Sequence, residues 1–112
     1  MGEMDGREKR VARNEATSRE INEGIQEAHD GAAPDEHLRM LCECGHESCE
    51  RVIAITSDEY ERVRSDARHF AVILDHVIPE VEDIVEETDR FVVVAKRDGT
   101  PADVAIEENP RS

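Results

Sequence analysis

The stretch that decides the fold is MLCECGHESCERVIAIT, residues 40–56, which holds every cysteine of the chain and ends in a β-branched run typical of a strand. Side chains alternate between the two faces of an extended segment, so Cys42 and Cys44 point to the same side. Gly45 permits a tight turn that returns Cys49 to that side. Three thiols therefore converge, and this spacing predicts a zinc site with Zn–S bonds of about 2.3 Å.

The fourth ligand of this predicted site is open on spacing alone. A structural zinc takes four ligands, so one more residue must join the three cysteines. His46 lies inside the cysteine loop, and His76 lies far along the chain. A ligand from His76 closes the longer loop and so contributes more to folding. We favour His76 and keep His46, or a position filled by water or an acid, as alternatives.

Two interpretations without a resting metal compete with the zinc site. The cysteines are either three inert thiols or a metal-free redox sensor. Free cysteines generally lie singly in apolar surroundings, whereas the neighbours here are three glutamates and a serine. A disulfide between Cys42 and Cys44 would also be strained. Both observations favour a metal.

The composition indicates a small acidic protein. A chain of 112 residues with 38% hydrophobic and 3% aromatic residues holds one lean domain, of the kind that a metal helps to fold. The net charge of −14 makes nucleic acid and anionic membranes poor partners. The first residues, MGEMDGREKR, lack the apolar stretch of a secretory signal, and no run is long enough to span a membrane. We expect a cytoplasmic location, where thiols stay reduced.

Composition divides the chain into four segments. They are a disordered start at 1–9, an N-terminal helix and linker at 10–36, a zinc-binding α+β domain at 37–97 and a disordered tail at 98–112. With helical spacing, one face forms a narrow stripe made of Val11, Ser18, Ile21, Ile25 and Ala28. Gly24 weakens this helix, so it docks on the domain or on a partner, or forms only in part.

The 37–97 segment alternates short apolar runs with turn residues. The predicted elements are an extended stretch at 38–44, a strand at 52–55, a helix at 57–67, a strand at 69–74 and a hairpin of 81–86 with 91–96. Thr56 and Glu59 predict a capping box. A short helix at 80–87 is the alternative, because Pro79 is typical of a helix start. The fold class is α+β: a small zinc-stapled domain with short antiparallel strands and one short helix.

The whole pattern resembles a family of small, mostly uncharacterised actinobacterial proteins. The residues that carry the resemblance are Cys42-Glu43-Cys44-Gly45, Cys49, Ile55-Thr56, Glu59-Tyr60, Val63-Arg64, Phe70, His76, Pro79-Glu80, Phe91 to Val94 and Lys96. The resemblance covers about residues 10–97, and it implies a bacterial intracellular zinc protein with His76 as the fourth ligand. The chain departs from the family at Leu74-Asp75, where proline and glycine are usual.

These features predict a non-catalytic structural-zinc protein that acts as an acidic protein-interaction or regulatory module. Three thiolates and one histidine saturate zinc and leave no position for substrate. We expect no catalytic residues, another protein as partner, and a monomer or a homodimer through the N-terminal helix. The alternative is a zinc-thiolate redox switch, in which oxidation ejects the metal.

Two lesser alternatives are a zinc enzyme and a nucleic-acid binder. An enzyme needs an open metal position and a general base, for which Glu43, Glu47 and Glu50 are candidates. No catalytic signature accompanies them. A nucleic-acid surface would use the basic residues near the site, namely Arg51, Arg62, Arg64 and Arg68. Interleaved acids predict salt bridges on a solvated helix instead.

Overall fold

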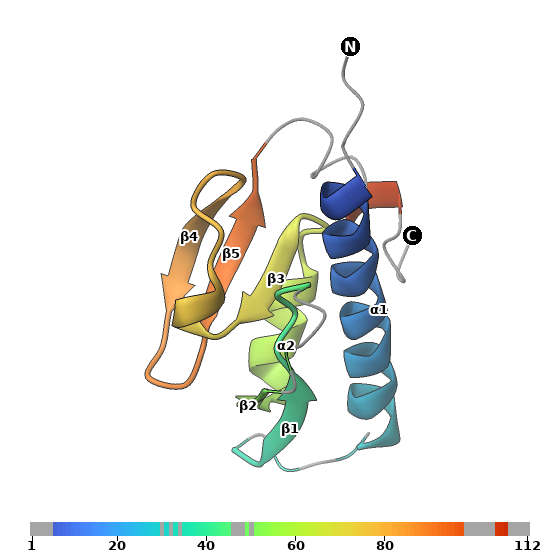
Figure 1. Cartoon of the computed structure of the whole chain (residues 1–112). Coiled ribbons are helices and arrows are strands. Elements are labelled where there is room, and N and C mark those ends of the chain that lie inside the picture. The colour runs from blue at the N-terminus through green and yellow to red at the C-terminus, as the bar shows by residue number, and fades with distance from the viewer. Residues whose placement is uncertain are drawn as a thin grey trace.

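The computed structural model describes residues 6–29, 31, 33, 35–45, 49, 51–97 and 105–107. In chain order the elements are α1 (Gly6–Ala28), β1 (His37–Leu41), β2 (Val52–Thr56), α2 (Ser57–Arg64), β3 (His69–Val72), the 3₁₀ helix η1 (Leu74–His76), β4 (Glu82–Glu87) and β5 (Val92–Lys96). The predicted α+β class is confirmed. Figure 1 shows α1 along one side of the molecule and β4 at the opposite side.

The strands form two small antiparallel sheets. β1 pairs with β2 so that Leu38 lies opposite Ile55, and the inward-facing residues of this hairpin are buried. The second sheet has the order β3-β5-β4, which confirms the predicted hairpin over the alternative helix at 80–87. β5 is central because its run of valines buries both faces, as continuous β-branched strands do.

The core lies on both faces of the pair β3 and β5. On one face the β1–β2 hairpin and α2 pack against Ala71, Phe91 and Val93. On the other face the cluster is made of Phe70, Val72, Val92, Val94, Ala105 and two of the thiols, Cys42 and Cys44. Two of the predicted metal ligands, Cys42 and Cys44, therefore belong to the hydrophobic core rather than to an isolated loop.

α2 begins at the predicted capping box. The Thr56 hydroxyl accepts from the Glu59 backbone N–H at 3.1 Å, and the Glu59 carboxylate accepts from the Thr56 N–H at 2.8 Å. These contacts satisfy two of the backbone donors that a helix start leaves unpaired. The helix ends at Arg64, earlier than the predicted 67, and β3 ends at Val72, earlier than the predicted 74, because η1 follows.

The predicted face of α1 is buried only in part: Val11, Ser18 and Ile25 are half-buried, and Ile25 packs against the core. The helix buries Ala12, Glu15, Arg19 and Asn22, whereas Ile21 is 47% exposed and Ala28 is exposed. Polar residues occupy the most buried positions because α1 packs largely against backbone carbonyls and charged side chains. Polar side chains can form hydrogen bonds with these groups. α1 also begins at Gly6, within the segment predicted to be disordered.

Several predictions fall outside the described residues. Residues 1–5, 98–104 and 108–112, where disorder was predicted, lie outside them, although residues 105–107 form a helical turn with Ala105 buried. The predicted division of the chain at residues 36 and 37 stays a prediction. Among the described helices, none has the length and apolarity to cross a membrane.

Candidate metal centre

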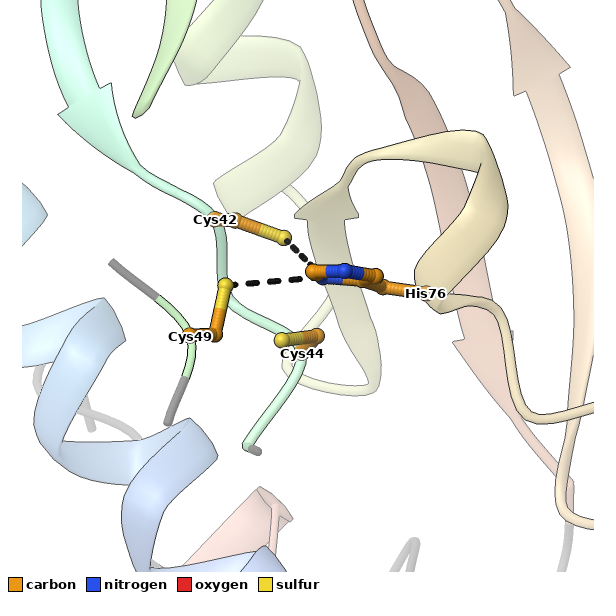
Figure 2. A group of neighbouring side chains, drawn as sticks. All are labelled: Cys42, Cys44, Cys49 and His76. Atoms are coloured by element: carbon orange, nitrogen blue, oxygen red, sulfur yellow. Dashed lines mark hydrogen bonds between the residues drawn. The ribbon is translucent and has the colours of Figure 1, made fainter. Parts of the chain in front are cut away.

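Four side chains converge at one end of the two sheets. Cys42 and Cys44 follow β1, Cys49 precedes β2 in the same loop, and His76 ends η1 (Figure 2). One ligand atom from each lies within 4.8 Å of the other three. These four residues are positioned to hold a metal ion. His46, the alternative fourth ligand, lies outside the described residues.

The distances in this group fit ligands that share an ion. The Nδ1 atom of His76 lies 3.6 Å from the Cys42 Sγ and 3.4 Å from the Cys49 Sγ. Tetrahedral zinc with bonds of about 2.3 Å to sulfur and 2.0 Å to nitrogen separates S and N by about 3.5 Å. The geometry therefore suits a four-coordinate ion held through Nδ1.

Backbone groups fix two of the four candidate ligands, Cys42 and His76, in place. The Cys42 N–H donates to the Arg51 carbonyl at 3.0 Å, which continues the β1–β2 pairing by one residue. The Ile73 N–H donates to the Cys42 Sγ at 3.3 Å, and the His76 N–H closes η1 on the Ile73 carbonyl at 2.8 Å. Gly45 has a φ of 79°, as the predicted turn requires. Leu74 and Asp75, where the chain departs from the resembling family, form the η1 turn that presents His76.

The thiols need a cation to ionise here. A hydrogen bond with Cys44 and burial raise the pKa of Cys42, and burial raises the pKa of Cys49. A metal ion has the opposite effect, because a coordinating thiol is deprotonated by the charge of the ion. Binding should therefore release protons and weaken as the pH falls.

Glu43 is the residue that the sequence reasoning misplaced. It was a candidate general base, but its carboxylate is fully buried and faces away from the metal ligands, into the core. It accepts hydrogen bonds from four groups: the Asn22 amide at 2.9 Å, the Tyr60 hydroxyl at 3.0 Å, the Arg64 guanidinium at 3.2 Å and the Ala71 N–H at 2.9 Å. Strand alternation could have found it, because a residue between two ligands faces the other way.

Glu43 ties three elements to the ligand-bearing segment, since its donors belong to α1, α2 and β3. The Tyr60 ring is fully buried, and burial followed by the Glu43 charge raises the pKa of its hydroxyl. Arg64 also donates to the His69 carbonyl, and its guanidinium lies over the rings of Tyr60 and Phe70 at 5.2 and 5.6 Å. A buried carboxylate is tolerated only when it is bonded and paired in this way.

A second buried charge cluster joins α1 to the sheet. The Lys96 ammonium lies 2.5 Å from the Glu15 carboxylate and 2.6 Å from that of Glu82. Two acids share one base, and burial raises the pKa of Glu15 to about 7 despite Lys96. Glu82 also accepts from the Ile78 N–H at 2.7 Å. The cluster holds the N-terminal helix against the last strand.

The basic residues near the site are largely paired with acids. Arg62 bonds Glu86 at 3.3 Å, and Arg68 bonds Asp66 at 3.3 Å. Arg64 is buried against Glu43. Three of the four arginines considered for nucleic-acid contact therefore neutralise acids of the same chain. Arg68 pairs with an acid two residues away, whereas the partners of Arg62 and Arg64 are distant in the sequence.

Comparison with known proteins adds no relative. No family model, no curated protein and no solved structure matches the chain. The resemblance to small actinobacterial proteins therefore stays a prediction, and the function rests on the site itself.

Proposed function

We propose that the chain is a non-catalytic zinc protein, in which Cys42, Cys44, Cys49 and His76 hold one structural Zn²⁺ and the acidic surface binds another protein. The observation that carries the proposal is the convergence of these four ligand atoms within 4.8 Å. Three thiolates and an imidazole are soft ligands that select zinc over Mg²⁺ or Ca²⁺. Four protein ligands leave a tetrahedral ion no position for water, so a structural role follows.

The interaction role rests on the charge. The chain carries 28 acids against 14 bases, and internal ion pairs engage Arg62, Arg64, Arg68, Arg90 and Arg97. A surface left with excess acid suits a basic patch on a partner protein, and it repels phosphate backbones. Partner binding of this kind weakens as salt rises.

Native mass spectrometry of the protein purified without added metal tests the metal part. We expect one zinc per chain in the wild type, and loss of that mass in Cys44→Ser and His76→Ala. His46→Ala is the matched control, which should keep its zinc. Zinc loss in His46→Ala with retention in His76→Ala would show that His46, not His76, is the fourth ligand. A metal-free wild type would contradict the proposal.

A second candidate function is a zinc-thiolate redox switch, which the partial exposure of Cys49 favours. Two thiolates would give two electrons to hydrogen peroxide, with two protons taken up, and would form one disulfide and two waters as the ion leaves. Zinc release by mild peroxide that a thiol reductant reverses would support this function. Zinc that stays bound under the same treatment would favour the purely structural role.

A further inference from the structure

The segment from Leu41 to Gly45 faces two ways. Its even-numbered residues, Cys42 and Cys44, point to the metal centre, whereas the odd-numbered residues contact α1. The Glu43 side chain contacts α1 because side chains alternate along extended backbone, whereas Leu41 and Gly45 contact α1 through backbone groups. Candidate metal ligands and contacts with α1 therefore alternate along the same five residues.

Asn22 makes the central contact of α1 with this segment. Its amide oxygen accepts from the Leu41 N–H at 2.8 Å, and its amide nitrogen donates to the Leu41 carbonyl at 2.9 Å. The other hydrogen of that nitrogen goes to the Glu43 carboxylate at 2.9 Å. Asn22 thus pairs with the residue before Cys42 as a neighbouring strand would, and it is fully buried.

Gly45 makes a second, closer contact. The Asn14 amide donates to the Gly45 carbonyl at 3.1 Å. A Cβ at Gly45 would lie 2.6 Å from the Val11 carbonyl oxygen and 2.6 Å from the Glu15 Cγ. The turn that follows Cys44 therefore lies directly against the backbone of α1.

The character of this interface makes it sensitive to the shape of the segment. Between residues 10 and 28 of α1, where burial is described, three of the four buried residues are polar: Glu15, Arg19 and Asn22. Hydrogen bonds weaken steeply when their angles change, whereas apolar burial is not directional. The hydrogen bonds between α1 and the ligand-bearing segment therefore keep their geometry only while the segment keeps the conformation that brings Cys42 and Cys44 together.

We propose that docking of α1 and retention of the metal are thermodynamically coupled, so that α1 acts as a strap that closes the metal centre from behind. The inference rests on the proposed zinc function and names the element that regulates it. Undocking of α1 frees the ligand-bearing segment and speeds loss of the ion. Linkage requires the reverse as well, so a bound ion holds α1 in place.

The first test compares Asn22→Ala with Thr17→Ala, an exposed position on the same helix. Zinc transfer from the loaded full-length protein to a chromophoric chelator is timed, and hydrogen exchange of the α1 amides is measured. We expect Asn22→Ala to accelerate both by at least about fivefold, the lower end of typical coupling. Thr17→Ala should change neither. Faster α1 exchange in Asn22→Ala with zinc transfer equal to that of Thr17→Ala would overturn the coupling.

A second variant separates docking of the helix from the local contact of Asn22. Arg19 donates from α1 to the Ala67 carbonyl at 2.7 Å and the Ala105 carbonyl at 2.8 Å, and neither acceptor belongs to the ligand-bearing segment. We expect Arg19→Gln to accelerate zinc transfer as well, because it loosens the whole helix. Unchanged zinc transfer in Arg19→Gln, with α1 exchange accelerated, would overturn the strap.

Two controls keep these outcomes separate from the proposed function and from misfolding. Exchange of the β5 amides, which must stay slow in each variant, shows that the sheet is intact. If Asn22→Ala fails this control, Arg19→Gln decides. A wild type that holds no zinc contradicts the proposed function, whereas zinc that every variant retains equally contradicts only the coupling.

Discussion

Position 43 illustrates how one residue can serve a site that it does not touch. The two cysteines beside Glu43 belong to the candidate metal centre, and its carboxylate faces Asn22, Tyr60 and Arg64. Each of its oxygens is bonded to donors alone. The carboxylate therefore fixes the ligand-bearing segment from the core side. Groups that surround metal ligands in proteins orient them in a similar way.

Replacement of Glu43 by glutamine should be severe. The amide nitrogen of glutamine would oppose groups that are already donors, and Arg64 would become a buried charge without its partner. We expect a loss of about 3–5 kcal/mol in the free energy of unfolding, measured with denaturant on the metal-loaded protein. Glu36→Gln, at an exposed acid, is the control and should stay within about 0.5 kcal/mol of wild type. Equal losses in the two variants would contradict this account.

Glu59 should give the protein an acid-sensitive contribution. Its hydrogen bond to Arg90, at 2.6 Å, is the main cause that lowers its pKa from 4.5 to about 2. A carboxyl with a lowered folded pKa stabilises fully above its unfolded pKa and loses that contribution as pH falls from about 4.5 to about 2.

Glu59→Gln isolates this contribution, because glutamine still caps the helix but does not titrate. The difference in unfolding free energy between wild type and Glu59→Gln should shrink as pH falls through that window. Protonation of metal ligands affects both proteins alike, so it cancels in the difference. Denaturant unfolding at a series of pH values measures it, and a difference that stays constant would refute the assignment.

At the scale of elements, α1 shows where periodicity fails. The apolar stripe predicted Ile21 as a buried residue, but the next residue, Asn22, occupies that place. Periodicity assumes that buried means apolar, and α1 docks on backbone carbonyls and charged groups instead. The capping box of α2 was predictable because its signal is local, whereas the partners of α1 are distant in the sequence.

Replacement by alanine should change stability in opposite directions at Gly24, within α1, and at Gly45, which contacts α1. Gly24 is a helical residue with nothing within 4 Å of an added Cβ, so Gly24→Ala should stabilise by about 0.5–1 kcal/mol. Gly45 has a positive φ and faces Val11 closely, so Gly45→Ala should destabilise by at least about 1–2 kcal/mol. Thermal unfolding of the metal-loaded variants measures both signs. A Gly45→Ala protein as stable as wild type would show that α1 does not lie on the loop.

At the scale of the molecule, the candidate metal centre joins the two sheets. Cys42 extends the β1–β2 hairpin, and His76 follows β3 of the other sheet. The cysteine spacing predicted three ligands from local geometry. The choice of His76 depended on an argument about loop closure, because no local pattern shows which distant histidine returns to the site. The position of His76 depends on η1, and therefore on the residue at which β3 ends.

Removal of the metal should therefore loosen the whole fold. A ligand that binds only the folded state stabilises by about 2.7 kcal/mol at 100 times its Kd, so the unfolding midpoint should rise with free zinc. Cys44→Ser should behave like chelator-treated wild type and lose amide dispersion across residues 37–97. The measurement is a thermal melt at several buffered zinc concentrations. A midpoint that ignores zinc, or a well-dispersed Cys44→Ser spectrum, would argue against a structural ion.

The position of β5 between β3 and β4 also sets an order on biosynthesis. Both neighbours leave the ribosome before β5, so each waits without its strand partner until residues 92–96 are made. All four metal ligands precede β5 in the chain. If the proposed function holds, the ligands are therefore complete before the larger sheet can form, and the nascent chain can bind its ion first.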